Sequence, residues 1–195
     1  LASQRLDLLQ DVLAGSSDEG SHERLPPLPL LADNLHRHAS AIRRALQSTA
    51  PLVQDAVIFT GIIDHANLKY FLPCSDVLVA PSVFPEAFGM VAVEALACGV
   101  LPIVTYQSAF KEIADVVDTH LAAYDLSLAS VPLSADACLR IAQNVMTCFA
   151  FQERMPSTEH AQAFKQALRA IAITHYSWSS IVTTYVDFYR SANPH

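Results

Sequence analysis

The sequence is poor in charged side chains. Asp, Glu, Lys and Arg make up 16% of its 195 residues, whereas about 25% is typical of soluble domains. The net charge of −7 disfavours broad electrostatic attraction to nucleic acid or to anionic lipid. We therefore expect no nucleic-acid partner.

Long apolar runs are also missing, although 52% of the residues are hydrophobic. Pro, Ser, Glu and Gly interrupt every candidate before it reaches the roughly 18 residues that span a bilayer. The first residues also lack the charged and apolar pattern of a signal peptide. These absences predict a cytoplasmic protein without a transmembrane segment, and the apolar excess suggests a surface that a partner domain covers.

Metal-binding and nucleophile motifs are absent as well. The four cysteines have no Cys-x-x-Cys spacing and lie in segments that resemble core, which predicts reduced, buried thiols at Cys74, Cys98, Cys138 and Cys148. His36 and His38 point to different faces of a helix, with no carboxylate to complete a site. Ser82 lacks the Gly-x-Ser-x-Gly setting of a hydrolase nucleophile. We therefore expect neither a metal site nor a nucleophile-elbow hydrolase.

The length suits one α/β domain and is too short for two Rossmann-like domains. A Gly- and Ser-rich connector at 15–21 and three prolines between 26 and 29 make residues 1–34 an irregular segment with one short helix, without the usual start of the domain. Residues 35–175 are then the Rossmann-like domain, opened by a helix at 35–46, and residues 176–195 form an aromatic C-terminal helix.

Strand and helix patterns alternate in the middle of the chain. Short β-branched runs followed by helix signals give βαβαβ within about 50 residues, which predicts a parallel sheet with flanking helices. The expected strands are 57–60, 76–80 and 101–105, and the expected helices are 64–72, one starting near Gly89, 135–150, 158–173 and 179–191.

Two carboxylates stand eight positions apart in the apolar run 85–99. A helix from Gly89 would be covered almost all round and would carry Glu94 into a poorly solvated place, where a carboxylate needs hydrogen-bond donors. Glu86 lies just before this helix, beside N–H groups that favour an anion. A ligand with a phosphate at the helix start and hydroxyls near Glu94 is a nucleotide sugar in physical terms.

The same residues resemble the Glu-x7-Glu element of retaining glycosyltransferases with the GT-B fold, family four. The flanking runs follow in that family's order: Val57–Gly61, Asp76–Ser82, Glu86–Met90 and Glu94–Gly99. Tyr176-Ser177-Trp178 and the aromatic residues after it are similar to the C-terminal end of many members. The resemblance implies the C-terminal, donor-binding half of a GT-B architecture.

The resemblance also implies roles for single residues on the rim where parallel strands end. Glu86, as the catalytic residue, contacts the donor sugar, and Glu94 binds the ribose hydroxyls. The other donor-binding positions hold the base (Gly61 and Ile62), line the cleft (Pro81 and Ser82) or offer backbone N–H groups to sugar and diphosphate (Phe88, Gly89 and Met90).

The implied reaction is transfer of a hexose from a UDP-, GDP- or ADP-sugar with retention, without a metal or other cofactor. The acceptor-binding N-terminal domain of the GT-B fold is expected to be absent from this chain. Trp178, with Tyr185 and Tyr189 nearby, is expected to be a packing residue rather than a sugar platform.

The sequence departs from the family in its phosphate-binding groups. The Arg and Lys after the family's first strand have no clear counterpart, with Arg5 as the substitute, and the Gly-Gly before a glutamate is here Ala109-Phe110-Lys111-Glu112. Two alternatives therefore stay open: a catalytically inactive binding or scaffolding module, and a GT-B nucleotide-sugar epimerase.

Overall fold

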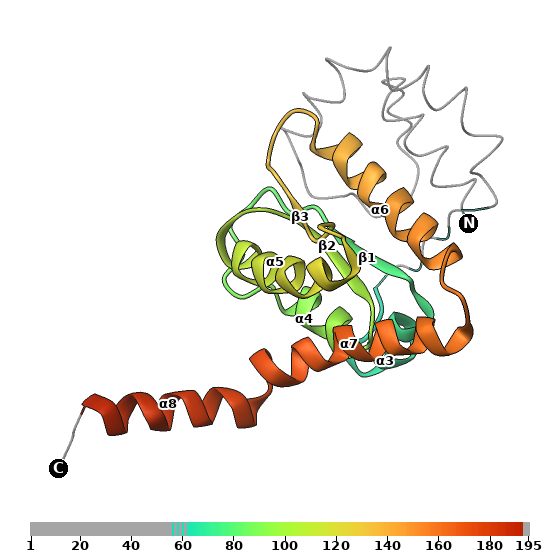
Figure 1. Ribbon diagram of the computed structural model, residues 1–195. Helices are drawn as coiled ribbons and strands as arrows, with labels where there is room; N and C mark the ends of the chain where they lie inside the picture. Colours follow the sequence, from blue (N-terminus) through green and yellow to red (C-terminus); the bar gives the residue numbers. More distant parts are fainter. Residues whose placement is uncertain (1–55, 57, 59, 61, 193–195) are drawn as a thin grey trace. The chain divides into compact units, whose positions relative to one another are not determined.

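The computed structural model describes residues 56, 58, 60 and 62–192 (Figure 1). Asp64–His195 form one of two compact units, and Leu1–Ile63 form the other. The predicted segment 1–34, the helix at 35–46 and Gly61 lie outside the described residues. Of the predicted strand 57–60, Ile58 and Thr60 are described, and neither lies in a strand.

A three-stranded parallel sheet forms the centre of the unit that starts at Asp64. The strands β1 (Val77–Ala80), β2 (Leu101–Thr105) and β3 (Ser130–Val131) lie side by side in this order. Val77 pairs with Leu101, and Val104 pairs with Ser130. Every residue of β2 is buried, as expected for the middle strand of a parallel sheet covered on both faces. The predicted α/β class with a parallel sheet and flanking helices is confirmed.

Helices cover this sheet and extend the chain. In order they are α3 (His65–Phe71), the 3₁₀ turn η1 (Leu72–Cys74), α4 (Met90–Ala97), α5 (Ser108–Leu121), the 3₁₀ turn η2 (Ala122–Tyr124), α6 (Ala137–Glu153), α7 (Thr158–Tyr176) and α8 (Trp178–Ala192). Helices α4 and α5 pack on one side of β2, α6 packs along all three strands, and α7 lies against α4 (Figure 1). The predicted helices near 64–72, 135–150, 158–173 and 179–191 are therefore present.

The core lies between the sheet, α4, α5 and α7. Its largest fully buried side chains include Phe110, Leu96, Ile103 and Leu168. Next to it, Phe151 of α6 and Phe164 of α7 meet edge to face, with ring centroids 5.2 Å apart. Arg169 of α7 donates from Nε to the carbonyl oxygen of Ala97 over 2.8 Å. Because the C-terminal end of a helix carries partial negative charge, this cation also stabilises α4.

Helix α4 begins after Gly89, as predicted, but it is covered on one face only. Ala92, Ala95 and Leu96 are buried, whereas Met90 and Val91 are exposed. The expectation of burial almost all round is therefore wrong. A short helix that packs against the sheet, α7 and α5 still keeps a solvent-facing side, even when nearly all its residues are apolar.

Two elements were not predicted from the sequence. Helix α5 buries Phe110, Ile113, Ala114, Val117 and Leu121, a stripe with the period of a helix that the sequence displays. Strand β3 has only two residues. It is held by Asp118 of α5, whose carboxylate accepts the N–H groups of Leu128, Ala129 and Ser130 and the Ser130 hydroxyl.

Burial of the cysteines and of Trp178 differs from expectation. Among the four free thiols only Cys148 is buried, and burial raises its pKa to about 11. Cys74 and Cys138 are exposed, and Cys98 is partly buried. Trp178 is 81% exposed rather than packed, since α8 buries none of its residues.

Candidate functional site

The loop between β1 and α4 carries Glu86 and is tied to the turn between β2 and α5. Gln107 donates from Nε2 to the carbonyl oxygens of Ser82 and Phe84. The hydroxyl of Thr105 also donates to the Ser82 carbonyl, which satisfies this buried side chain at the end of β2. The loops that follow β1 and β2 therefore meet at the rim where these parallel strands end.

Glu86 itself is bonded through its backbone in both directions. Its N–H donates to Ser108 Oγ over 2.8 Å, and its carbonyl accepts the N–H of Ala109 over 3.4 Å. The Glu86 carboxylate has no such bond within the described residues. The backbone is thus fixed while the side chain remains available.

The start of α4, shortly after Glu86 in the chain, offers backbone donors. Within the described part of the chain, the N–H groups of Phe88, Gly89 and Met90 donate no hydrogen bond. Gly89 has φ 77°, a left-handed conformation, and an added Cβ would stand 2.6 Å from the Phe110 ring. Only glycine fits this position without strain or displacement of the core. The geometry gives a helix start with free donors, which is suited to bind an anion.

Glu94 lies one turn further along α4 and is partly solvated. Its side chain is 28% exposed, and its Oε1 lies 3.6 Å from Nδ1 of His65 at the start of α3. His65 is far more exposed, at 77%, so this pair is worth little to the stability of the fold. Glu94 therefore has the hydrogen-bonding capacity that hydroxyl groups of a ligand require.

The remaining predicted positions differ in how firmly they are held. Pro81 is exposed, and the Ser82 hydroxyl donates to the Phe84 carbonyl over 3.1 Å. The ring of Phe88 meets Tyr176 of α7 edge to face at 6.3 Å. Burial raises the pKa of the Tyr176 hydroxyl, and the Glu112 carboxylate adds to this rise. Ile62 is 99% exposed and belongs to the preceding unit.

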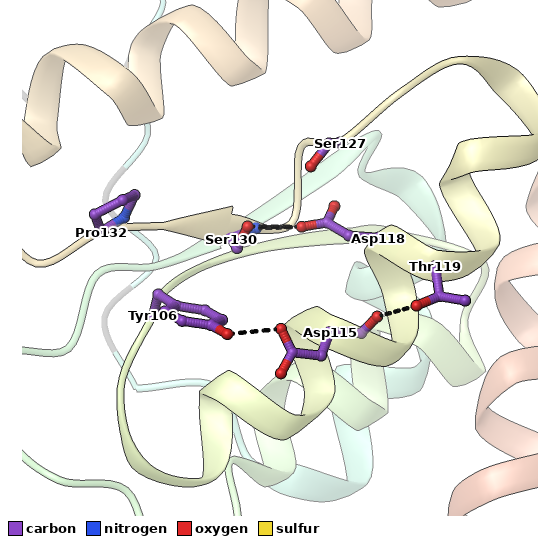
Figure 2. A pocket seen from close by; sticks show the side chains of 7 residues that line it. All are labelled: Tyr106, Asp115, Asp118, Thr119, Ser127, Ser130 and Pro132. Carbon is purple, nitrogen blue, oxygen red and sulfur yellow. Dashed lines mark hydrogen bonds between the residues drawn. The ribbon is translucent and has the colours of Figure 1, made fainter.

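A separate surface pocket of about 600 Å³ lies beside α5 and β3 (Figure 2). Most of its polar groups already serve the fold: Asp118 holds β3, the Tyr106 hydroxyl donates to Asp115 over 2.9 Å, and the Thr119 hydroxyl donates to the Asp115 carbonyl. The bond to Asp115 is the main reason why the pKa of Tyr106 is raised. None of the predicted site residues lines this pocket.

Among the described residues there is neither a candidate metal cluster nor a helix suited to a membrane. No group of three or more His, Cys, Asp or Glu side chains among them is placed to hold a metal ion. None of the helices in that part of the chain is both long and apolar enough to cross a membrane. Whether the site acts without a metal stays a prediction.

Comparison with known proteins gives the family of the central segment. Residues 43–121, which contain the Glu86 loop, α4, β2 and α5, match the family described as "Glycosyl transferases group 1". This segment belongs to the group 1 glycosyltransferases. The resemblance seen in the Glu86–Glu94 spacing and its flanks is thereby confirmed, and with it the Rossmann-like GT-B type of fold.

A protein similar to this chain is an uncharacterized glycosyltransferase of Methanocaldococcus jannaschii. The two are 26% identical over 140 residues, which are 72% of this chain and 32% of that protein. The chain spans about a third of the length of the curated relative it matches. No solved structure matches the chain.

Sequence reasoning missed the residues that hold the site together. Gln107 and Ser108 carry no motif, and their importance comes from bonds to residues more than twenty positions away. The one signal in the sequence was the departure from the family's Gly-Gly, which falls next to Ser108.

Proposed function

We propose that the loop 81–89 and α4 bind the nucleotide-sugar donor of a retaining hexosyltransferase. The observation that carries the proposal is the start of α4, where the N–H groups of Phe88, Gly89 and Met90 donate no hydrogen bond among the described residues and follow Glu86 closely in the chain. The match of residues 43–121 to group 1 glycosyltransferases supports this use of the site.

In this proposal the donor diphosphate lies at the start of α4. The N–H groups and the helix dipole stabilise the negative charge that grows on the diphosphate as the bond to the sugar breaks. Glu86 contacts the donor sugar, which passes through an oxocarbenium-like transition state, and Glu94 binds the ribose hydroxyls one turn further along. Gly61 and Ile62 hold the base, and Pro81 and Ser82 line the cleft.

The remaining functional expectations belong to the same proposal. The donor is a UDP-, GDP- or ADP-sugar, no metal or other cofactor takes part, and transfer to the acceptor needs an acceptor-binding domain beyond these residues. An inactive module or an epimerase would keep part of this donor site, so donor binding is the property to measure first.

Calorimetric titration of the chain with UDP, GDP and ADP and their glucose and mannose conjugates tests the proposal. We expect saturable binding of one base, with the conjugate bound more tightly than the free nucleotide because Glu86 contacts the sugar. Failure of a demonstrably folded chain to bind any of these compounds would overturn it.

Glu94→Ala tests the ribose assignment. Loss of hydrogen bonds to a charged acceptor should weaken binding of the nucleotide roughly tenfold or more, while the melting temperature stays close to that of the parent because Glu94 is partly solvated. Glu153→Ala, at the exposed end of α6, is the matched control and should change neither value. A folded Glu94→Ala protein with unchanged affinity would refute this role.

A further inference from the structure

Ser108 has a backbone conformation that its residue type disfavours. It has φ 41°, whereas the second non-glycine residue with positive φ among those described, Asp125, has φ 58°. Asp125 follows a 3₁₀ turn, and Asp is one of the residues that tolerate the left-handed region. Ser108 has no such preference, so the surrounding structure must hold it there.

The Ser108 side chain makes a hydrogen bond to Glu86 that accompanies the strained backbone. Ser108 Oγ accepts the Glu86 N–H over 2.8 Å, and the next residue, Ala109, donates its N–H to the Glu86 carbonyl. A glycine would adopt the same φ with little strain, but it has no hydroxyl to accept this bond. Serine therefore connects α5 to the backbone of Glu86 at the expense of local conformational free energy.

The neighbouring residue extends the same connection. Gln107 joins the carbonyl oxygens of Ser82 and Phe84 through one amide nitrogen. The β2–α5 turn therefore fixes the backbone of the β1–α4 loop up to Glu86. The residues that follow Glu86 form the start of α4.

We infer that Ser108 is a positioning residue for the donor sugar, acting through Glu86. Its hydroxyl fixes the backbone of Glu86, and this sets the direction in which the carboxylate meets the sugar. The inference rests on the proposed donor site. It also predicts a selective effect: the sugar part of the donor depends on Ser108, whereas the nucleotide part, held by Glu94, does not.

Ser108→Gly is the variant that separates this role from a general structural one. It removes the hydroxyl and relieves the backbone strain, so the melting temperature should not fall. The Glu86 amide should exchange with solvent faster by roughly fivefold to tenfold, as expected for the loss of one hydrogen bond, in hydrogen-exchange NMR. Ser127→Gly, at an exposed position just before β3, is the matched control.

Titration then compares the free nucleotide with its sugar conjugate. We expect Ser108→Gly to lose affinity for the conjugate by roughly fivefold or more while it binds the free nucleotide as the parent does. Equal losses for both ligands, or no loss for either, would overturn the inference although the parent still binds. If the parent protein binds neither ligand, the proposed donor site has failed, and the inference fails with it.

Discussion

At the scale of single residues, the site depends on two positions with positive φ, a conformation that few residue types adopt. Gly89 is held at φ 77° with the Phe110 ring close behind it, and Ser108 is held at φ 41° by the bond to Glu86. The two residues lie on the two turns that meet at the rim of the sheet. Fixed backbone at these turns leaves the Glu86 carboxylate and the donors of α4 free for a ligand.

Gly89→Ala is predicted to be strongly destabilising. The left-handed conformation costs a residue with a Cβ about 1–2 kcal/mol, and overlap with the Phe110 ring adds to this cost because Phe110 is buried in the core. Urea denaturation measures the loss.

A double variant separates the two costs of Gly89→Ala. Phe110→Ala removes the Cδ1 and Cε1 atoms that the new methyl group would meet but leaves the dihedral strain, so the destabilisation caused by Gly89→Ala should be smaller in the Phe110→Ala background. A single variant as stable as the parent would contradict the described turn.

At the scale of elements, the sequence predicted what local patterns encode. Strand β2 has the bounds that its β-branched run predicts, and helix α4 starts after Gly89 as predicted. The Glu86–Glu94 spacing pointed to the segment that matches the group 1 glycosyltransferases. Helix α5 can be predicted from the helical period of its apolar residues. Strand β3 could not be predicted, because two residues carry no pattern and their position depends on Asp118, at least ten positions away.

In the candidate site, too, the contacts between residues distant in the sequence could not be predicted. The residues that touch a ligand in the proposal were named from the motif, whereas Gln107 and Ser108 act through bonds that only the folded chain creates. Burial of α4 was overestimated, because residue type indicates how apolar a helix is but not how many of its sides have neighbours.

Asp118→Ala is predicted to weaken the attachment of β3. The carboxylate accepts three backbone N–H groups and one hydroxyl, and Leu128 and Ala129 are buried. Removal leaves buried donors unsatisfied, which costs about 1–3 kcal/mol for each such group. Chemical denaturation should show a loss of at least this size.

The control for Asp118→Ala is a carboxylate on the same helix. Asp115 is exposed and accepts the Tyr106 hydroxyl at the surface, so Asp115→Ala should change the stability little. Removal of that acceptor should instead lower the pKa of Tyr106 towards its ordinary value, as an absorbance titration can show. Equal destabilisation by the two alanine variants would contradict the role assigned to Asp118.

At the scale of the whole molecule, α8 differs from the other long helices in the part of the chain that the structure describes. It has no buried residue, and its large apolar side chains are exposed: Trp178, Val182, Tyr185, Val186, Phe188 and Tyr189. Its hydrogen bonds to the preceding segment come from Ser180, which bonds the Ile173 carbonyl, and from Ser177 at the junction. The stability of the core should therefore not depend on α8.

Removal of residues 178–195 tests this prediction. Because exposed side chains contribute little to folding, the truncated chain should keep its free energy of unfolding within about 0.5–1 kcal/mol. Leu168→Ala in α7 removes a side chain that is 2% exposed, and it should cost about 2–5 kcal/mol.

Trp178, the sole tryptophan of the chain, provides an independent measurement: its fluorescence should be that of a solvent-exposed indole and should be quenched by iodide. Protected fluorescence together with a destabilised truncation would show instead that α8 packs against the folded chain, and its apolar face would then be part of the core.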